Sequence, residues 1–483
     1  MPTDPDPPSG AGDLVIAANR LPVEILPNGE VARSPGGLVS ALSAVSTDTT
    51  QWVGWLGPGA TEQTYNEFKS DNCHPVPLSK AEVRAHYEGF CNSIVWPLFH
   101  GRLRSPELTR SWWRSYRAVN QRFASTVAAV APEGGTVWVH DYHLLLTAAM
   151  LRARRPDLRI GFFLHIPFPP AQLFAMLPWR REILLGMVGA DLIGFQTPDD
   201  VRNVLDSLEH YGGGQWRRRH GRMDIDAFPI SIDFAHWSSL GLAAATSGRE
   251  RRAALGADFV LVGVDRLDYT KGIVERLWAF GELLDEGLLD PATCSFVQIA
   301  VPGRSNIDSY REERQDVEAL VNRINERHRR PNGEGPIRYL PAQHSEEELA
   351  GWYRGADALV VTSLADGMNL VAKEFVACRG DAAASIVLSE FAGAAQDLPG
   401  AIIVNPYDTD AVKRAMLDAY RMSMVERVAR MTSMREQVRS HDVHLWARSF
   451  LDRLTRVCSA HHSNHESRAV DGIAAPPTPV AQK

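Results

Sequence analysis

Short apolar runs alternate along the chain with longer stretches in which apolar residues recur every three or four positions. The runs are rich in Val, Ile and Phe, as is typical of parallel strands buried on both faces. They occupy residues 14–20, 52–55, 137–140, 159–164, 190–195, 259–265, 296–301, 337–340, 358–364, 384–388 and 401–404. Helical patterns such as 144–155 lie between them. The alternation predicts an α/β protein with two Rossmann-like, doubly wound parallel-sheet domains facing across a cleft.

The pattern also predicts where the domains begin and end. An Ala/Gly/Ser-rich stretch at 241–248 suits a domain linker. We expect a disordered N-terminal tail (1–13), a first domain (14–235), a second domain (236–440), a C-terminal helix (441–458) and a disordered Ser/His/Pro/Ala-rich tail (459–483).

Polar residues follow several strands of the first predicted domain. Arg20, Asp141, His165 and Gln196 each stand at the carboxyl end of a strand. Ligands of doubly wound sheets bind beyond this edge, so these side chains are candidates for substrate contacts. The alternative is that each is an incidental loop residue.

The stretch from 358 to 374 combines a strand, an acidic turn and a helix that begins near Leu370. The free N–H groups of the helix's first turn favour an anion beyond the strand. Asp366 stands before that turn and suits a hydroxyl-rich group, and Glu374 lies one turn further, in reach of a ribose. A sugar nucleotide combines these parts. The alternative is a capping Asp and a solvated Glu.

Arginine and lysine side chains follow two strands of the second predicted domain. Arg266 and Lys271 emerge together from one turn, where a diphosphate could lie, and Arg304 comes after the next strand. The alternative for the first two is a pair of surface cations bonded to Asp265 and Asp268.

A glycine turn and an aromatic segment in the first half remain open to two interpretations. Gly36 and Gly37 would let a backbone approach a ligand closely, although a glycine pair is a weak signal. Tyr87 and Trp96 bracket a segment dense in aromatic residues, which suits either a core or a sugar pocket.

Composition excludes several classes of protein. The net charge of −7 argues against nucleic acid or an anionic membrane as the main partner. No long apolar run or signal segment is apparent, so a cytoplasmic protein is expected. The five cysteines form no CxxC pair, and neither GxGxxG nor GxxxxGK[ST] is present.

Two further motifs resemble metal sites. His140-x-x-His143 sits at a strand end, which does not place both side chains on one face, so structural or substrate roles are favoured. Asp224 and Asp226 form an Asp-x-Asp, but the arginines of 217–222 can neutralise them. We expect no metal and no cofactor.

Seven ordered motifs resemble the trehalose-6-phosphate synthases, with a match from about residue 14 to 457. The motifs are Asn19-Arg20-Leu-Pro, Gly36-Gly37-Leu, Trp96-Pro-Leu-Phe-His, Val139-His-Asp141-Tyr-His-Leu-Leu, Gly161-Phe-Phe-Leu-His165-Ile-Pro-Phe-Pro, Arg266-Leu-Asp-Tyr-Thr-Lys271-Gly and Asp366-Gly-Met-Asn-Leu-Val-Ala-Lys-Glu374. The resemblance implies a GT-B glycosyltransferase that retains configuration, needs no metal, and moves glucose from a nucleotide-glucose to glucose 6-phosphate.

The resemblance also implies roles for individual residues. Donor binding falls to Gly36, Gly37, Arg266, Lys271, Leu370, Val371, Ala372, Lys373 and Glu374. Acceptor binding falls to Arg20, Tyr87, Trp96, Asp141 and Arg304. The catalytic set is Asp366, His165, Arg266 and Lys271, with Asp366 and His165 on the transferred glucose.

Two points stay open at this stage. Ser345 occupies a variable position near the nucleotide base, so the choice between UDP-glucose and ADP-glucose is undecided. The alternatives to this function are a sibling synthase with another phosphorylated acceptor, such as glycerol 3-phosphate, and a catalytically silent sugar-nucleotide sensor. A homo-oligomer, a tetramer by resemblance, is expected.

Overall fold

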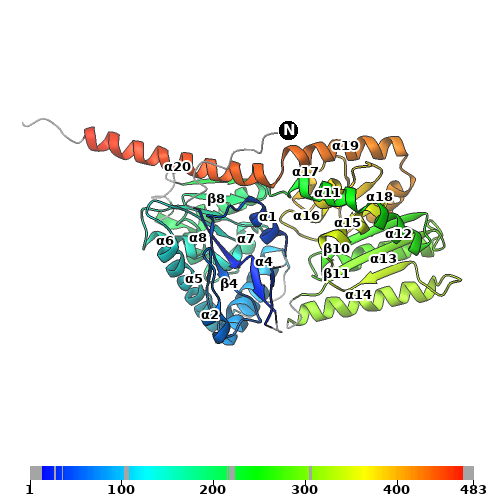
Figure 1. The fold of residues 1–483 in the computed structure, drawn as a ribbon, viewed down its shortest axis with the longest axis horizontal. Coiled ribbons are helices and arrows are strands. Elements are labelled where there is room, and N and C mark those ends of the chain that lie inside the picture. Colours follow the sequence, from blue (N-terminus) through cyan, green and yellow to red (C-terminus); the bar gives the residue numbers. More distant parts are fainter. Residues whose placement is uncertain are drawn as a thin grey trace, which may run out of the picture.

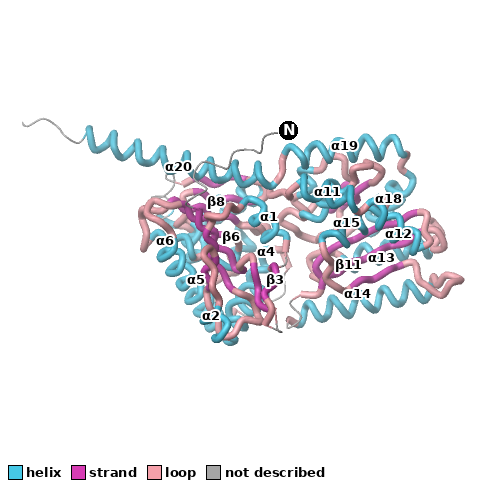
Figure 2. The backbone as a smooth tube through the Cα atoms, viewed as in Figure 1, coloured by secondary structure: helices cyan, strands magenta, loops and turns pink. Residues whose placement is uncertain are grey.

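Two parallel β-sheets, each packed against helices, form the two halves of the molecule (Figure 1). The computed structural model describes residues 14–26, 29–34, 36–102, 108–214, 216, 223–303 and 307–471, with side chains up to Ala460. Figure 2 shows the strands of the two sheets gathered in separate halves. The predicted α/β class with two doubly wound sheets is confirmed.

The first sheet has seven parallel strands in the order β5-β4-β1-β6-β7-β8-β9. Their bounds are β1 (Leu14–Arg20), β4 (Gln51–Trp55), β5 (Cys73–Pro75), β6 (Thr136–His140), β7 (Arg159–Phe163), β8 (Leu192–Phe195) and β9 (Asp224–Ala227). After Arg20 the chain forms the antiparallel pair β2 (Val23–Ile25) and β3 (Val31–Arg33). The strand order reverses between β1 and β6, and that is where ligands of such sheets bind.

The second sheet has six parallel strands in the order β12-β11-β10-β13-β14-β15. Their bounds are β10 (Phe259–Arg266), β11 (Cys294–Val301), β12 (Ile337–Leu340), β13 (Ala358–Val361), β14 (Ser385–Ser389) and β15 (Ile402–Val404). The predicted strand 358–364 ends early, at Val361: beyond it Leu364 N donates to Thr270 O, and the Thr362 hydroxyl donates to Gly272 O. This sheet reverses its order between β10 and β13.

Helices connect the strands in both halves. Those of the first half are α1 (Gly37–Val45), α2 (Glu62–Glu67), α3 (Lys80–Glu82), the π-helix η2 (Val83–Val95), α4 (Trp96–Phe99), α5 (Arg110–Val130), the 3₁₀-helix η3 (Tyr142–Leu144), α6 (Thr147–Arg152), α7 (Ala171–Phe174), α8 (Arg180–Met187) and α9 (Pro198–Tyr211). The later ones are α11 (Phe234–Ala243), α12 (Ala245–Leu255), α13 (Ile273–Asp285), α14 (Asp308–Arg327), α15 (Glu346–Gly355), α16 (Leu370–Cys378), α17 (Ala394–Asp397), α18 (Thr409–Arg421), α19 (Met424–Ser440) and α20 (Val443–Asp471).

The small residues of 241–248 do not form a linker, because this stretch lies in α11 and α12. A Cβ on Gly241 would stand 2.4 Å from Cys378 O, and one on Gly248 would stand 2.6 Å from Arg354 Cβ. The small side chains therefore allow close packing of these helices on the second half, which the composition alone could not distinguish from flexibility.

The C-terminal helix is longer than predicted. It was expected to end near Val457, before a disordered tail from 459, but α20 runs from Val443 to Asp471. Gly472 is the first glycine or proline after Val443, so no strong helix breaker interrupts the intervening sequence. The part of the predicted tail from 472 to 483 lies outside the described residues.

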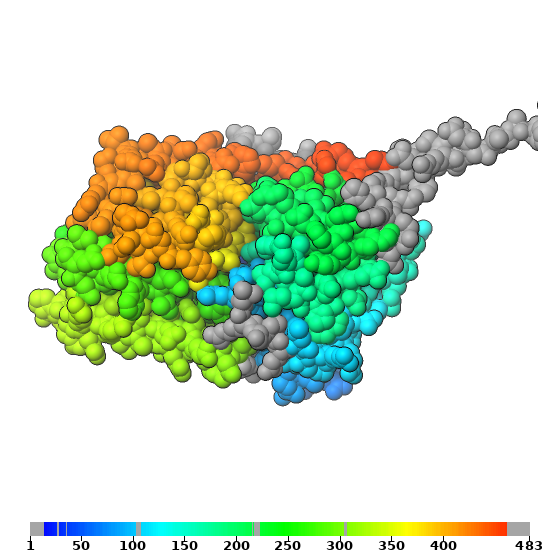
Figure 3. All heavy atoms as spheres, turned by 180° about the vertical axis from the view of Figure 1, so that it is seen from behind, coloured from blue at the N-terminus to red at the C-terminus, as the bar shows by residue number. Residues whose placement is uncertain are grey.

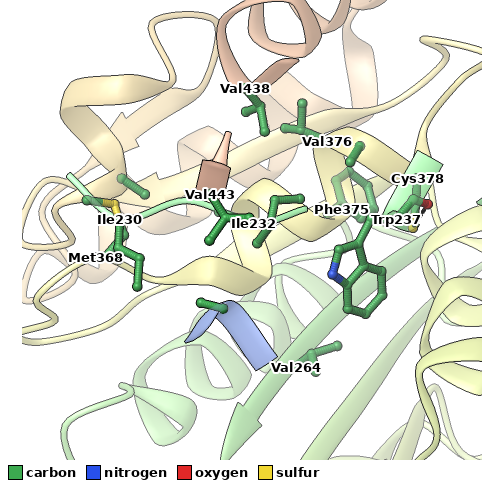
Figure 4. Packing of buried hydrophobic residues seen from close by; sticks show 14 of the residues in the cluster. Ile230, Ile232, Trp237, Val264, Met368, Phe375, Val376, Cys378, Val438 and Val443 are labelled. Atoms are coloured by element: carbon green, nitrogen blue, oxygen red, sulfur yellow. Dashed lines mark hydrogen bonds between the residues drawn. The ribbon is translucent and has the colours of Figure 1, made fainter. Parts of the chain in front are cut away.

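The chain passes between the halves at two neighbouring places, 228–233 and 441–443. Val443 N donates to Ile232 O over 3.0 Å, which joins the two crossings. Figure 4 shows Ile232 and Val443 in one buried apolar cluster together with Val376 and Val438. After the second crossing α20 returns to the first sheet, where the Phe450 ring packs on Gly161 and Gly194.

The two halves are distinct bodies in the space-filling view (Figure 3), with α20 in red along the upper edge of the first half. None of the helices in the described part of the chain is long and apolar enough to cross a membrane.

Candidate functional site

The loop between β13 and α16 is the centre of the candidate site. Asn369 adopts φ 80° and its side chain accepts from Ala372 N over 3.1 Å, so it caps α16. Among the described residues no acceptor is seen for the N–H groups of Leu370 and Val371, the first two of the helix. The predicted anion site at this helix terminus is therefore available.

Lys271 and Asp366 form an ion pair beside this terminus. Lys271 Nζ lies 2.6 Å from Asp366 Oδ2, and the two side chains are 11% and 13% exposed. Asn369 Nδ2 also donates to Asp366 Oδ2 over 3.2 Å. Burial opposes ionisation of Asp366, but Lys271 and Asn369 outweigh it and hold the pKa below its usual value. The carboxylate is thus charged and can accept from hydroxyl groups.

Arg266 reaches from the second half toward the first. It is exposed at the end of β10, and its guanidinium carbon lies 5.1 Å from the centre of the Trp96 ring. Asp265 is ion-paired with buried Arg276, not with Arg266. The sequence left open that Arg266 and Lys271 pair with Asp265 and Asp268. The ion pairs seen among the described residues are instead Lys271–Asp366 and Arg276–Asp265.

Glu374 lies one turn into α16 and accepts from Tyr353 Oη over 3.0 Å. Burial raises the pKa of Glu374 to about 7. This carboxyl is neither a cap nor a freely solvated group, and it can accept from a second hydroxyl when ionised.

His165 stands on the first half opposite the loop of Asp366. A Cβ on Gly367 would come within 2.0 Å of His165 O, so only glycine allows this approach between the halves. Burial lowers the pKa of His165 to about 3, which keeps the imidazole neutral at pH 7. Asp141, held at φ 74°, accepts from His165 N over 3.3 Å.

The candidate acceptor residues Arg20 and Tyr87 lie together. Arg20 donates to Glu24 over 2.8 Å, and its guanidinium carbon lies 4.7 Å from the Trp55 ring centre and 5.9 Å from that of Tyr87. Tyr87 belongs to η2 and stacks on His143 at 5.8 Å between ring centres.

Most of the aromatic segment belongs to the core, and its part in a sugar pocket stays a prediction. Phe90, Ile94, Val95 and Trp96 are buried in the core, whereas Tyr87 is only partly buried. Tyr87 contacts Arg20, and Trp96 contacts Arg266.

Gly36, which precedes α1, and Gly37, its first residue, differ in role. Gly36 has φ 122° and open space around its Cβ position, as a backbone that meets a ligand would need. A Cβ on Gly37 would lie 3.0 Å from Leu370 Cδ1 of α16, so Gly37 allows the halves to approach each other.

Arg304 lies outside the described residues. Ser345 caps α15, where its hydroxyl accepts from Glu348 N over 3.3 Å.

The side-chain contacts of two residues, Tyr353 and Lys373, had no signal in the sequence. Tyr353 is 21 positions from its partner Glu374. The side chain of Lys373 donates to Ile230 O over 2.8 Å and to Asp397 Oδ2 over 2.7 Å, although only its backbone was expected to matter. Such contacts depend on how the helices pack, which spacing does not reveal.

The two motifs that resembled metal sites are used otherwise. Asp224 accepts from Arg453 of α20 over 2.6 Å; the arginines of 217–222, which were expected to neutralise it, lie outside the described residues. Over the described residues, no group of three His, Cys, Asp or Glu side chains is arranged to hold a metal ion.

Comparisons with known proteins show which family the chain belongs to. The trehalose-6-phosphate synthase of Mycolicibacterium gilvum is 46% identical over 93% of this chain and 94% of its own length. A UDP-forming α,α-trehalose-phosphate synthase of Burkholderia xenovorans, solved in complex with glucose-6-phosphate, is 32% identical and covers 92% of this chain and 99% of its own, with a TM-score of 0.82. An Escherichia coli protein described as trehalose-6-phosphate and bound with UDP-2-fluoro glucose is 32% identical over 91% of this chain and 98% of its own, with a TM-score of 0.80. The family model of glycosyltransferase family 20 matches residues 12–456, and the chain belongs to that family.

Proposed function

We propose that this chain transfers glucose from a nucleotide-glucose to glucose 6-phosphate with retention, giving α,α-trehalose 6-phosphate and a nucleoside diphosphate. The observation that carries the proposal is the Lys271–Asp366 pair at the open N-terminus of α16, facing the half that holds Arg20 and His165. It supplies a cation and amides for a diphosphate and a carboxylate for sugar hydroxyls. The related synthases named above support the same substrates.

The donor binds on the second half in this proposal. The diphosphate lies against the first-turn amides of α16, with Arg266 and Lys271 as counter-charges, and Gly36 faces it from the other half. Glu374 accepts from the ribose, and Asp366 and His165 contact the transferred glucose. We assign residues 236–440 to this donor side and 14–235 to the acceptor side.

The acceptor phosphate is held by Arg20, with Arg304 as a second cation, and Asp141 accepts from acceptor hydroxyls. Tyr87 and Trp96 line this side. Arg20 is already oriented by Glu24 and the Trp55 ring, which limits the side-chain entropy lost on binding.

The chemical step is a front-face substitution. The bond between the glucose C1 and the diphosphate oxygen breaks while C1 bonds to the acceptor hydroxyl oxygen, whose proton passes to the leaving phosphate. Arg266 and Lys271 stabilise the charge that develops on the diphosphate, and no protein nucleophile is required. The proposed location is the cytoplasm, where both substrates are available, and the proposed assembly is a homo-oligomer.

Release of nucleoside diphosphate from purified protein tests the proposal. UDP-glucose and ADP-glucose are each supplied with glucose 6-phosphate or with glycerol 3-phosphate. Release with glucose 6-phosphate alone supports the assignment, and the two donors decide the base preference. Release with glycerol 3-phosphate alone identifies a sibling synthase, and no release with either acceptor leaves a sugar-nucleotide sensor.

A further inference from the structure

A chain of hydrogen bonds runs from the crossing segment 228–233, called the linker from here on, into the ring of His165. Ile230 N donates to Gln196 Oε1 over 3.0 Å. Gln196 Nε2 lies 3.2 Å from His165 Nδ1, and His165 Nε2 lies 3.0 Å from His140 Nδ1. Gln196 is only 2% exposed and His140 is fully buried, whereas His165, which lies between them, is partly exposed.

The hydrogen bond from Ile230 N to Gln196 determines which atom donates and which accepts in each of the following hydrogen bonds. A backbone N–H only donates, so the end of the Gln196 amide that faces Ile230 is its oxygen. The amide nitrogen only donates, so His165 Nδ1 must accept. The proton of the neutral His165 ring is then on Nε2, which donates to His140 Nδ1.

The linker end of this chain is itself held in place. Ile230, drawn within the buried cluster of Figure 4, accepts from the Lys373 side chain over 2.8 Å through its carbonyl oxygen. Lys373 belongs to α16, the proposed donor helix, and is 2% exposed. Ile230 therefore bonds to Gln196 through its N–H group and to the proposed donor helix α16 through its carbonyl oxygen.

We propose that Gln196 is a positioning residue that keeps His165 in the Nε2–H tautomer, so that the ring offers a hydrogen-bond donor to the transferred sugar. The inference rests on the proposed role of His165 in donor binding. In the ligand-free protein the Nε2–H group donates to His140, and a sugar hydroxyl can take the place of that acceptor. Without Gln196 the ring could carry its proton on Nδ1 and would offer no donor at Nε2.

The other groups around the His165 ring do not determine its tautomer. The groups that face His165 are His140 from β6, Phe163 from β7, Trp446 from α20 and Asp141, whose carboxylate accepts from the His165 backbone. Among the hydrogen bonds seen in the described part of the chain, the one from Gln196 meets the Nδ1 side of the ring.

Nitrogen NMR of the ¹⁵N-histidine-labelled full chain without substrates reads the tautomer directly. The signal of His165 is identified by its loss in His165→Asn. We expect a proton on Nε2 in the wild type. In Gln196→Glu a carboxylate replaces the amide donor, and we expect the proton on Nδ1 or on both nitrogens. A wild-type ring with its proton on Nδ1 overturns the proposal.

Kinetics of the same variants test the consequence for the reaction. Gln196→Glu and the uncharged Gln196→Met should lower kcat about tenfold, with the KM for glucose 6-phosphate changed less than about twofold. Gln121→Glu, the same substitution beside Arg154 on the first half, should leave both constants unchanged.

Unchanged kcat in both Gln196 variants overturns the positioning role, whether or not the tautomer shifts. If Gln196→Glu fails to fold, the wild-type spectrum and Gln196→Met decide. The NMR measurement needs no substrate. A wild type that keeps the Nε2–H tautomer but releases no nucleoside diphosphate would therefore refute the proposed function and leave the tautomer assignment standing.

Discussion

Lys271 Nζ lies 2.6 Å from Asp366 Oδ2, and the two side chains come from turns 95 positions apart in the chain. The pair couples the two functions assigned to this loop, because the cation proposed for the diphosphate also neutralises the carboxylate proposed for the sugar. Donor binding then means sharing Lys271 between Asp366 and the diphosphate, not filling a vacant cation site.

A double-mutant cycle measures this coupling. Lys271→Met leaves the Asp366 carboxylate nearly buried without its cation, which should cost about 3–5 kcal/mol of unfolding free energy. Asp366→Asn should destabilise in the same way, and the double variant should lose less than the sum of the two single losses. Chemical denaturation of the four proteins gives the values. Additive losses would show that the ion pair does not contribute to stability.

The sequence predicted the sheets and the edge where the candidate site lies, because both follow from local patterns. Apolar runs specified the strands, and polar residues such as Arg20 and His165 marked their carboxyl ends. The strand 358–364 was predicted too long by three residues, and the contacts that follow Val361, such as that of Thr362 with Gly272, come from another part of the chain.

Pairing partners could not be predicted in this way. Two pairs come into contact only when the helices pack: Glu374 with Tyr353, and Lys373 with Ile230. The small residues of 241–248 illustrate the same limit. Ala, Gly and Ser suit both a flexible linker and a tightly packed helix, and the neighbours that decide between them are distant in sequence.

Glu374 should make donor binding depend on pH. Burial raises its pKa to about 7 in the ligand-free protein, above the usual 4.5. Ribose hydroxyls that donate to the ionised form would lower this pKa, so binding near pH 7 should release a proton, and affinity for UDP-glucose should rise between pH 6 and 8. UDP-glucose itself has no group that titrates there. Calorimetry in buffers of different ionisation enthalpy measures the proton release.

Glu374→Gln provides the control for that measurement, since its amide cannot titrate. When the variant binds UDP-glucose, it should release no proton from position 374, and its affinity should depend less on pH. The ligand-free wild type should also lose stability relative to this variant as pH rises from about 4.5 to about 7, because the unfolded chain releases the proton first. Equal proton release by the two proteins would contradict the role of Glu374.

Arg20 should determine the affinity for the acceptor phosphate. Arg20→Ala removes a guanidinium that Glu24 and Trp55 already orient, and a lost charged hydrogen bond costs about 1.5–3 kcal/mol. The KM for glucose 6-phosphate should therefore rise about tenfold to a hundredfold, with little change for the nucleotide-glucose. Arg304→Ala should act in the same direction.

Arg33→Ala is the matched control for Arg20→Ala, because Arg33 lies in the neighbouring hairpin and its side chain is 59% exposed. It should leave both KM values unchanged. If Arg20→Ala raised the two KM values equally, with an unchanged melting temperature, Arg20 would not be the phosphate ligand.

The reaction should proceed without a divalent metal. The proposed counter-charges of the diphosphate are Arg266 and Lys271, and Asp224 of the Asp-x-Asp motif is ion-paired with Arg453. EDTA should leave the rate unchanged, and the double variant Asp224→Asn, Asp226→Asn should keep the wild-type kcat. Activity that EDTA abolishes and magnesium restores would refute this prediction.

Lys373 should contribute more to stability than Lys413, because its contacts join α16 to the linker. Its side chain is 2% exposed and donates to Asp397 and to Ile230 O, so Lys373→Met should cost about 3 kcal/mol of unfolding free energy. Lys413 is the matched control. It also meets carboxylates, but Glu282 and Glu286 are 37% and 45% exposed, so Lys413→Met should cost at most about 1 kcal/mol. Thermal and urea unfolding of the two variants compare these losses. Similar losses would show that the contact with the linker does not stabilise the fold, and a larger loss for Lys413→Met would contradict the prediction outright.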